Sequence, residues 1–107
     1  MRNNNKMIFI YTTCRDAEEA KKIGRLIIEK KMASCVNTWP VESMYNWEGE
    51  FQNHSEVGMY IKTVEKKLQN IEDLLHQNHS YSVPCVAATA VYRINRPYKE
   101  WMATCIE

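Results

Sequence analysis

The chain has 107 residues, 45% of them hydrophobic and 25% charged, which suits one folded domain and is too short for two. Its 14 Lys and Arg nearly balance 13 Asp and Glu, so the formal net charge of +1 gives no general attraction to nucleic acid or to anionic membranes. No stretch approaches the roughly 18 apolar residues of a membrane span. We predict a single soluble domain over residues 7–107, with a disordered polar extension over residues 1–6.

The first predicted elements are a strand and a helix. The apolar run from Met7 to Tyr11 is typical of a central strand that is buried on both faces. Asp16 is suited to cap a helix, which we expect to run to about Lys31. Apolar side chains recur there at helical spacing at Ala17, Ala20, Ile23 and Ile27.

A long hairpin is predicted next. Strand character begins at Met32, and beyond Pro40 a period of two places on one face Val41, Ser43, Tyr45 and Trp47. The dipeptide Glu48-Gly49 is typical of a tight turn, because glycine readily takes a positive φ. The return strand is predicted from Val57 to Thr63.

The second half of the chain repeats the helix and the strand. A helical apolar stripe consists of Val64, Leu68, Ile71 and Leu75. Val83 to Ile94 is predicted to be the last strand, entered through Pro84, and Pro97 to Ala103 a short C-terminal helix. The order predicts an α+β, ferredoxin-like split βαβ sandwich (βαββαβ). Its antiparallel sheet should have the first and third strands in the middle, both helices on one face and a bare opposite face.

The cysteines and the common catalytic motifs limit the function. Cys14, Cys35, Cys85 and Cys105 show no Cys-x-x-Cys spacing, so we expect free thiols and a cytoplasmic location. Cys35 is predicted to lie in the core, whereas Cys14 is the better-placed reactive thiol. Without a phosphate loop, a metalloprotease motif or a nucleophile elbow, we predict no enzymatic activity.

Two other functions share this predicted fold. An RNA-recognition module would use Phe9, Tyr11 and Tyr60 as stacking rings, although the RNP pattern and a basic charge are missing. An acylphosphatase-like hydrolase would place an anion near Arg15 at the start of the first helix, although its Gly-rich loop is absent.

Five strings in register cover nearly the whole chain. They are Tyr11-Thr12-Thr13, Met32-Ala33-Ser34-Cys35-Val36-Asn37, Tyr45-Asn46-Trp47-Glu48-Gly49-Glu50, Glu56-Val57 with Ile61-Lys62-Thr63, and His79-Ser80-Tyr81-Ser82-Val83-Pro84. In this order they resemble the CutA family of divalent-cation-tolerance proteins from about Met7 to Ala103, as do Asn95, Tyr98 and Trp101 near the end. The resemblance implies a ferredoxin-like fold, a tight homotrimer built by the hairpins, and a link to copper and other divalent cations.

The resemblance also suggests metal ligands, with two departures. Some bacterial members have a cysteine on the first strand and two adjacent histidines as proposed copper ligands, where this chain has Tyr11, Asn78 and His79. The usual glutamate after the Val-Pro pair is Cys85 here. Imidazole suits Cu(II) and thiolate suits Cu(I), so His79 and Cys85 are the candidate ligands for copper or another divalent cation, neither being an obligatory cofactor.

The remaining candidates are polar and aromatic. Glu56 and Lys62 share a strand face, and with Tyr81, Trp47 and Trp101 they are predicted to line a ligand pocket between subunits. Trp39, Tyr45 and Phe51 are predicted to form the oligomer interface, because large apolar rings are commonly buried there. The predicted function is thus a homotrimeric protein of metal tolerance; the alternative is a trimeric small-molecule sensor whose subunit clefts hold a metabolite. The downstream partner is unknown.

Overall fold

A computed structural model describes residues 6–107. The predicted extension over residues 1–6 therefore lies outside the described residues except for Lys6, whose carbonyl oxygen accepts a hydrogen bond of 2.8 Å from the Glu65 N–H. None of the helices among residues 6–107 is long and apolar enough to cross a membrane.

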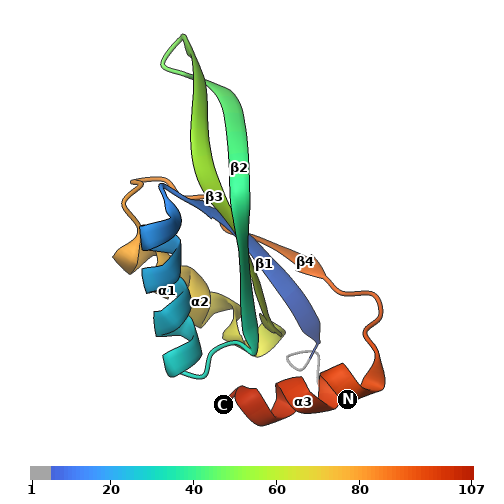
Figure 1. Cartoon of the computed structure of the whole chain (residues 1–107). Helices are drawn as coiled ribbons and strands as arrows, with labels where there is room; N and C mark the ends of the chain where they lie inside the picture. The colour runs from blue at the N-terminus through green and yellow to red at the C-terminus, as the bar shows by residue number, and fades with distance from the viewer. Residues whose placement is uncertain (1–5) are drawn as a thin grey trace.

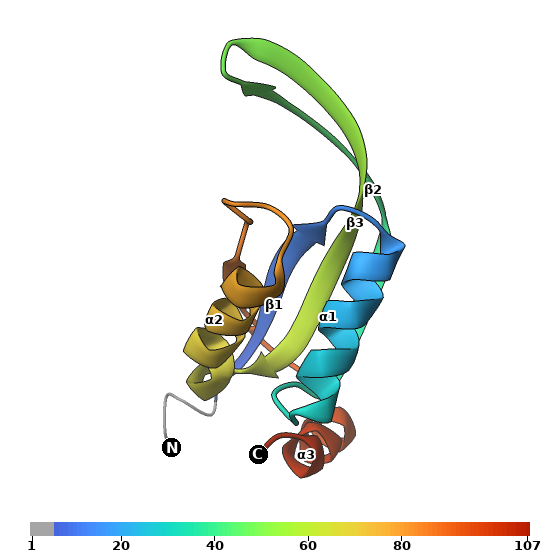
Figure 2. The same cartoon turned by 90° about the vertical axis from the view of Figure 1, so that its left-hand side faces the viewer.

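The predicted order of elements is confirmed. They are β1 (Met7–Cys14), α1 (Ala17–Glu29), β2 (Cys35–Trp47), β3 (Glu50–Val64), the 3-10 turn η2 (Glu65–Lys67), α2 (Leu68–Asn78), β4 (Ala87–Ala90) and α3 (Arg96–Cys105). The antiparallel sheet has the order β2-β3-β1-β4, with the first and third strands in the middle. Helices α1 and α2 cover one face of it, which gives the predicted α+β, ferredoxin-like arrangement (Figures 1 and 2).

Helix α1 begins at a reciprocal cap. The Asp16 side chain accepts a hydrogen bond of 2.9 Å from the Glu19 N–H. The Glu19 side chain in turn accepts one of 2.8 Å from the Arg15 N–H, as in a capping box displaced by one residue. The helix ends at Glu29, two residues before the predicted end, because Lys31 has a φ of 57° and cannot continue it.

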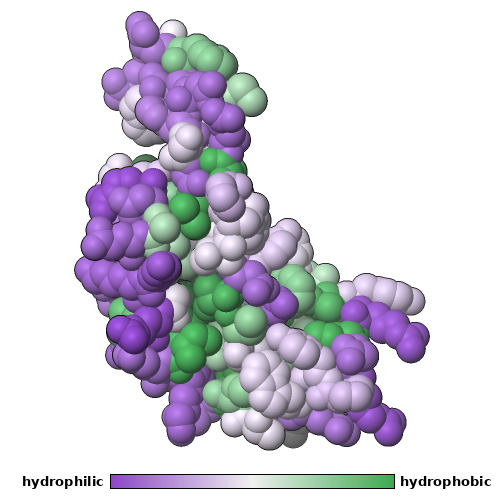
Figure 3. All heavy atoms as spheres, in the orientation of Figure 1, coloured by the Kyte–Doolittle hydropathy of each residue, from purple (hydrophilic) through white to green (hydrophobic). Residues whose placement is uncertain are grey.

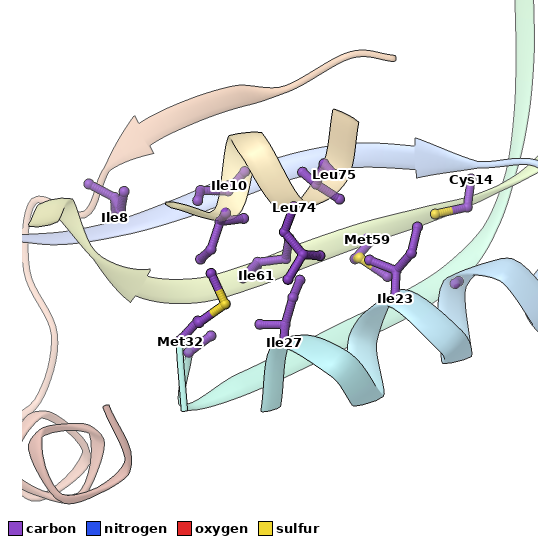
Figure 4. Packing of buried hydrophobic residues seen from close by; sticks show 13 residues of the cluster. Ile8, Ile10, Cys14, Ile23, Ile27, Met32, Met59, Ile61, Leu74 and Leu75 are labelled. Atoms are coloured by element: carbon purple, nitrogen blue, oxygen red, sulfur yellow. The ribbon is translucent and has the colours of Figure 1, made fainter. Parts of the chain in front are cut away.

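The core lies between the sheet and the two helices. Alternate side chains of β1 point toward the helices, and the buried partners include Ile10, Cys14, Ile23, Ile61 and Leu75 (Figure 4). On the other face, Phe9 and Tyr11 are only half-buried in the protomer. The prediction that the first strand is buried on both faces therefore holds for the helix-covered face alone.

The outer parts of β2 and β3 form an arm that projects from the rest of the molecule (Figure 1). Its tip is the predicted turn: Trp47 pairs with Glu50, and Glu48 and Gly49 have φ of 51° and 81°. Exposed apolar residues interrupt the hydrophilic surface of the arm, as Figure 3 shows. The period of two puts Tyr45 and Trp47 on one face of the arm and Phe51 on the other, so these rings do not form a single cluster.

The last strand is much shorter than predicted. We expected it from Val83 to Ile94, but only Ala87–Ala90 pair with β1. One further hydrogen bond joins the Val91 N–H to the Met7 carbonyl, and there β1 itself begins. The strand ends because its partner ends, and the apolar residues beyond it follow another path to α3. Likewise Val64, which we placed in the second helical stripe, is the last residue of β3.

Candidate metal and ligand sites

Three side chains that can bind a metal converge where β1 ends. A thiol, a carboxylate and an imidazole belong to Cys14, Glu19 and His79, and one ligand atom of each lies within 4.8 Å of the other two. They come from the last residue of β1, the first turn of α1 and the residue after α2. Cys14 is fully buried, Glu19 is 6% exposed and His79 is half-buried.

Hydrogen bonds fix two of the three side chains. The His79 ring accepts from the Tyr81 N–H at Nδ1 (3.0 Å), so its Nε2 carries the proton and donates to the Thr13 carbonyl (2.7 Å). The Glu19 carboxylate accepts from the Arg15 N–H and, at 2.8 Å, from the Ser80 N–H. These bonds hold the loop that follows α2 against the start of α1.

Burial sets the charge states of this cluster. Desolvation, with the nearby Glu19 and Asp16 carboxylates, raises the pKa of the Cys14 thiol to about 12. The prediction that Cys14 is the reactive thiol is therefore wrong: Cys14 lies in the core, and Cys35, which we placed there, is only half-buried on the other sheet face. Burial would also raise the pKa of Glu19, but hydrogen bonds from Arg15 and Ser80 lower it overall.

A second polar group lies between β3 and the loop after α2. The Tyr81 hydroxyl donates a hydrogen bond to the Glu56 carboxylate, so these two predicted pocket residues are in contact. Burial, and then Glu56, raise the pKa of Tyr81 well above its usual range. Burial also raises the pKa of Tyr11, and the nearby Cys85 and Glu56 add to this increase. Sequence reasoning assigned Tyr11 no role in this group.

The other predicted pocket residues lie elsewhere in the protomer. The Lys62 Nζ lies 5.7 Å from the ring centroid of Phe9 and 5.6 Å from that of Tyr98, a cation–π arrangement. Trp101 packs beside the same Tyr98, with ring centroids 5.4 Å apart. Trp47 is at the tip of the arm. Within one protomer, the predicted pocket residues therefore lie in three separate places.

Two hollows of the described protomer lie apart from all these groups. One, of about 430 Å³, is between α1 and β2 beside Gly24 and Val36, and one, of about 760 Å³, is near Lys30 and Asp73. Neither contains a predicted pocket residue. The contact between Glu56 and Tyr81 also lies outside both hollows.

The bare sheet face has a row of aromatic rings. Ring centroids of Trp39 and Tyr60 are 5.0 Å apart, those of Tyr11 and Tyr60 5.9 Å, and those of Phe9 and Tyr60 5.8 Å. The three rings considered for RNA stacking therefore pack together, and Trp39 extends the row. Arg15, considered for anion binding, forms an ion pair of 3.2 Å with Asp16.

Comparisons with known proteins identify the family of this chain. Residues 8–105 match the family model described as CutA1 divalent ion tolerance protein. The chain belongs to the CutA family. The divalent-cation tolerance protein CutA of Archaeoglobus fulgidus is 35% identical over 99 residues, which cover 92% of this chain and 97% of that protein. The CutA of Thermococcus kodakarensis is 38% identical over 96 residues, covering 90% and 92%.

Solved CutA structures have the same fold. CutA1 of Oryza sativa superposes with a TM-score of 0.93 at 34% identity, covering 99% of this chain and 98% of the other. The A. fulgidus protein, described as a periplasmic divalent cation tolerance protein, gives 0.92 at 35% identity, covering 94% and 99%. These similarities confirm the family and the ferredoxin-like fold inferred from the five strings.

Sequence reasoning named two of the three residues in the cluster of Cys14, Glu19 and His79 and missed the third. His79 was predicted as a metal ligand and Cys14 was noted as a thiol, but the structure pairs His79 with Cys14 in this cluster and not with Cys85. Glu19 was not among the predicted site residues. Its signal was the Asp16-x-x-Glu19 pattern, which is typical of a helix cap and predicts a glutamate folded back toward the end of β1.

Proposed function

We propose that this member of the CutA family acts as a homotrimer in the response and tolerance to divalent metal ions, binds copper without requiring it, and catalyses no reaction. The family match over residues 8–105 supports the metal link, because its members are described as divalent ion tolerance proteins. The observation that carries the assembly is the projecting arm with its exposed apolar side chains.

The arm supports a trimer on physical grounds. A two-stranded hairpin is marginally stable alone in water, so its apolar side chains favour burial against another copy. Trp39 on the bare sheet face, with Tyr45 and Phe51 on the arm, supplies the aromatic surface of that interface. Both edge strands, β2 and β4, also lack a partner on one side within the described protomer. Closed cyclic symmetry protects such edges.

A trimer also provides the predicted pocket. The arm of one protomer would carry Trp47 to a neighbour, beside the Glu56–Tyr81 pair or beside Lys62 and Trp101. This arrangement supports the alternative function as well, a trimeric sensor of a small molecule held between subunits. Glu56 and Lys62 would then bind and orient the ligand.

Copper binding follows from ligand chemistry. Imidazole suits Cu(II) and thiolate suits Cu(I), so we propose His79 as a donor for Cu(II) and the exposed Cys85 as a separate donor for Cu(I). We propose a cytoplasmic location on the basis of four free cysteines. Because the A. fulgidus relative is described as periplasmic, cell fractionation is the check on this location.

Native mass spectrometry of the purified chain tests the assembly and its ligands together. The expected result is a trimer, with retained metal or metabolite in the spectrum. Cells that lack the chain should grow less well in raised copper and recover when it is restored. A monomer, together with unchanged growth in copper, would contradict the proposal. So would turnover of any substrate in a broad screen, if Glu56→Gln abolished it and left the fold intact.

A further inference from the structure

We propose that Cys14, Glu19 and His79 form an interior site for a borderline divalent ion such as Zn(II), in which Cys14, and not Cys85, supplies the sulfur. The inference rests on the proposed response to divalent cations and adds to His79 two ligands that the family resemblance does not include. Neither Cys14 nor Glu19 matches a ligand position of that resemblance.

The donor set fits the ion. Zinc in proteins is bound by thiolate, imidazole and carboxylate, and many sites use three protein ligands with a fourth position open. Ligand atoms on one tetrahedral zinc lie roughly 3.3–3.8 Å apart. The three donors already lie within 4.8 Å of one another, so small shifts of the side chains would bring them to such separations. They are also fixed to three elements that the fold brings together.

The surroundings favour a cation. The Glu19 carboxylate is nearly buried beside a buried thiol, and a dication would offset the negative charge of both once the thiol proton is lost. Thr12 precedes this cluster on β1. Its side chain lies on the same face of β1 two residues before Cys14, is fully buried, and its hydroxyl has no hydrogen-bond partner within residues 6–107.

Metal binding would change the loop after α2. To bind the ion, the His79 ring must give up either its bond to the Thr13 carbonyl or the bond it accepts from the Tyr81 N–H. Glu19 accepts from the next residue of the same loop, Ser80. Tyr81 in this loop contacts Glu56, so occupancy of the metal site would alter the proposed ligand pocket.

X-ray absorption of the Zn(II)-loaded full-length chain, prepared with reductant, tests the site without any substitution. The expected first shell contains one sulfur at about 2.3 Å with nitrogen and oxygen at about 2.0–2.2 Å, at one zinc per protomer. A shell without sulfur would overturn the proposal.

Two variants then identify the sulfur. Cys14→Ala should lose the sulfur shell and weaken Zn(II) binding at least tenfold in a chelator competition, whereas the matched control Cys85→Ala should keep both. Circular dichroism verifies that Cys14→Ala folds, since Cys14 belongs to the core. A sulfur shell that persists in Cys14→Ala, or disappears in Cys85→Ala, would reject this ligand set. The trimeric mass and the growth in copper expected from the proposed function do not depend on zinc coordination by Cys14, so failure of one proposal is distinguishable from failure of the other.

Discussion

Glu19 is a nearly buried carboxylate whose charge is held by backbone N–H groups. Arg15 and Ser80 donate to it from opposite sides, so one side chain ties the start of α1 to the loop after α2. An ionised group with two such donors is stabilised relative to its protonated form, which is why the pKa of Glu19 is lowered in spite of burial. The same bonds place this carboxylate beside Cys14 and His79.

This carboxylate should make the fold sensitive to acid. Its pKa is lower in the folded state than the usual value of about 4.3, so its stabilising contribution is complete above pH 4.3 and is lost as the pH falls through the folded-state value. We expect Glu19→Gln to reduce the free energy of unfolding at pH 7 by about 1–3 kcal/mol and to flatten its acid dependence. Urea denaturation at pH 7, 5 and 3 is the measurement, with exposed Glu18→Gln as the control. Equal effects of the two substitutions would contradict the assignment.

Two glycines should respond to alanine in opposite ways. A Cβ at Gly58 would lie 2.8 Å from a methyl carbon of Val41 and 2.9 Å from the Trp39 ring, which is packed against Tyr60. Gly58→Ala should therefore destabilise the fold by about 1–3 kcal/mol through overpacking. At Gly24 in α1, the nearest atom, of Val36, is at 3.4 Å, so Gly24→Ala should stabilise by up to about 1 kcal/mol through helix propensity. Thermal unfolding of both variants checks the pair, and a loss of stability in both would refute the packing argument.

At the scale of elements, the turn of the arm carries a local strain. Glu48 has a φ of 51°, which is uncommon for a residue with a side chain, and it precedes Gly49 in a two-residue turn. Asn-Gly is the preferred pair for this turn type. We expect Glu48→Asn to raise the free energy of unfolding by a few tenths of a kcal/mol to about 1 kcal/mol. Calorimetric unfolding at fixed protein concentration measures it, and a lower melting temperature would count against the turn assignment.

Elements determined by local sequence were predictable, and those determined by distant partners were not. The Asp16 cap and the Glu48-Gly49 turn depend on adjacent residues, and both were predicted correctly. The end of β4 depends on where β1 begins, about 80 positions away, so the apolar run from Val83 to Ile94 gave a strand that was too long. Cys14 could have been placed in the core, because the period of two puts it on the same face of β1 as Ile10.

The candidate site was less predictable than the fold for a similar reason. Glu56 and Tyr81 belong to strings that the resemblance had already brought together, and they are in contact. Trp47 and Lys62 lie far apart on the hairpin, and only an assembly could join them. The cluster of Cys14, Glu19 and His79 depends on the packing of three elements, which no spacing in the sequence encodes.

At the scale of the whole molecule, the arm is expected to control assembly. The projecting arm makes the protomer elongated (Figure 1), with extents of 47 × 26 × 22 Å. Trp47 near the tip of the arm remains 54% exposed. In a homotrimer this indole would be buried against a neighbour, so a carboxylate in its place would be desolvated without a partner. We expect the parent chain to have the mass of three copies at micromolar concentration and Trp47→Asp to have the mass of one.

Light scattering after size exclusion measures these masses, and circular dichroism verifies that each variant is folded. The matched control is Ile28→Asp, which places the same charge on a 41% exposed apolar residue of α1, away from the arm. If Ile28→Asp remains trimeric while Trp47→Asp dissociates, the interface lies on the arm. A parent chain that is monomeric would exclude the trimer, and a trimer that persists in Trp47→Asp would place its contacts on the aromatic sheet face instead, where Trp39 and Tyr60 lie.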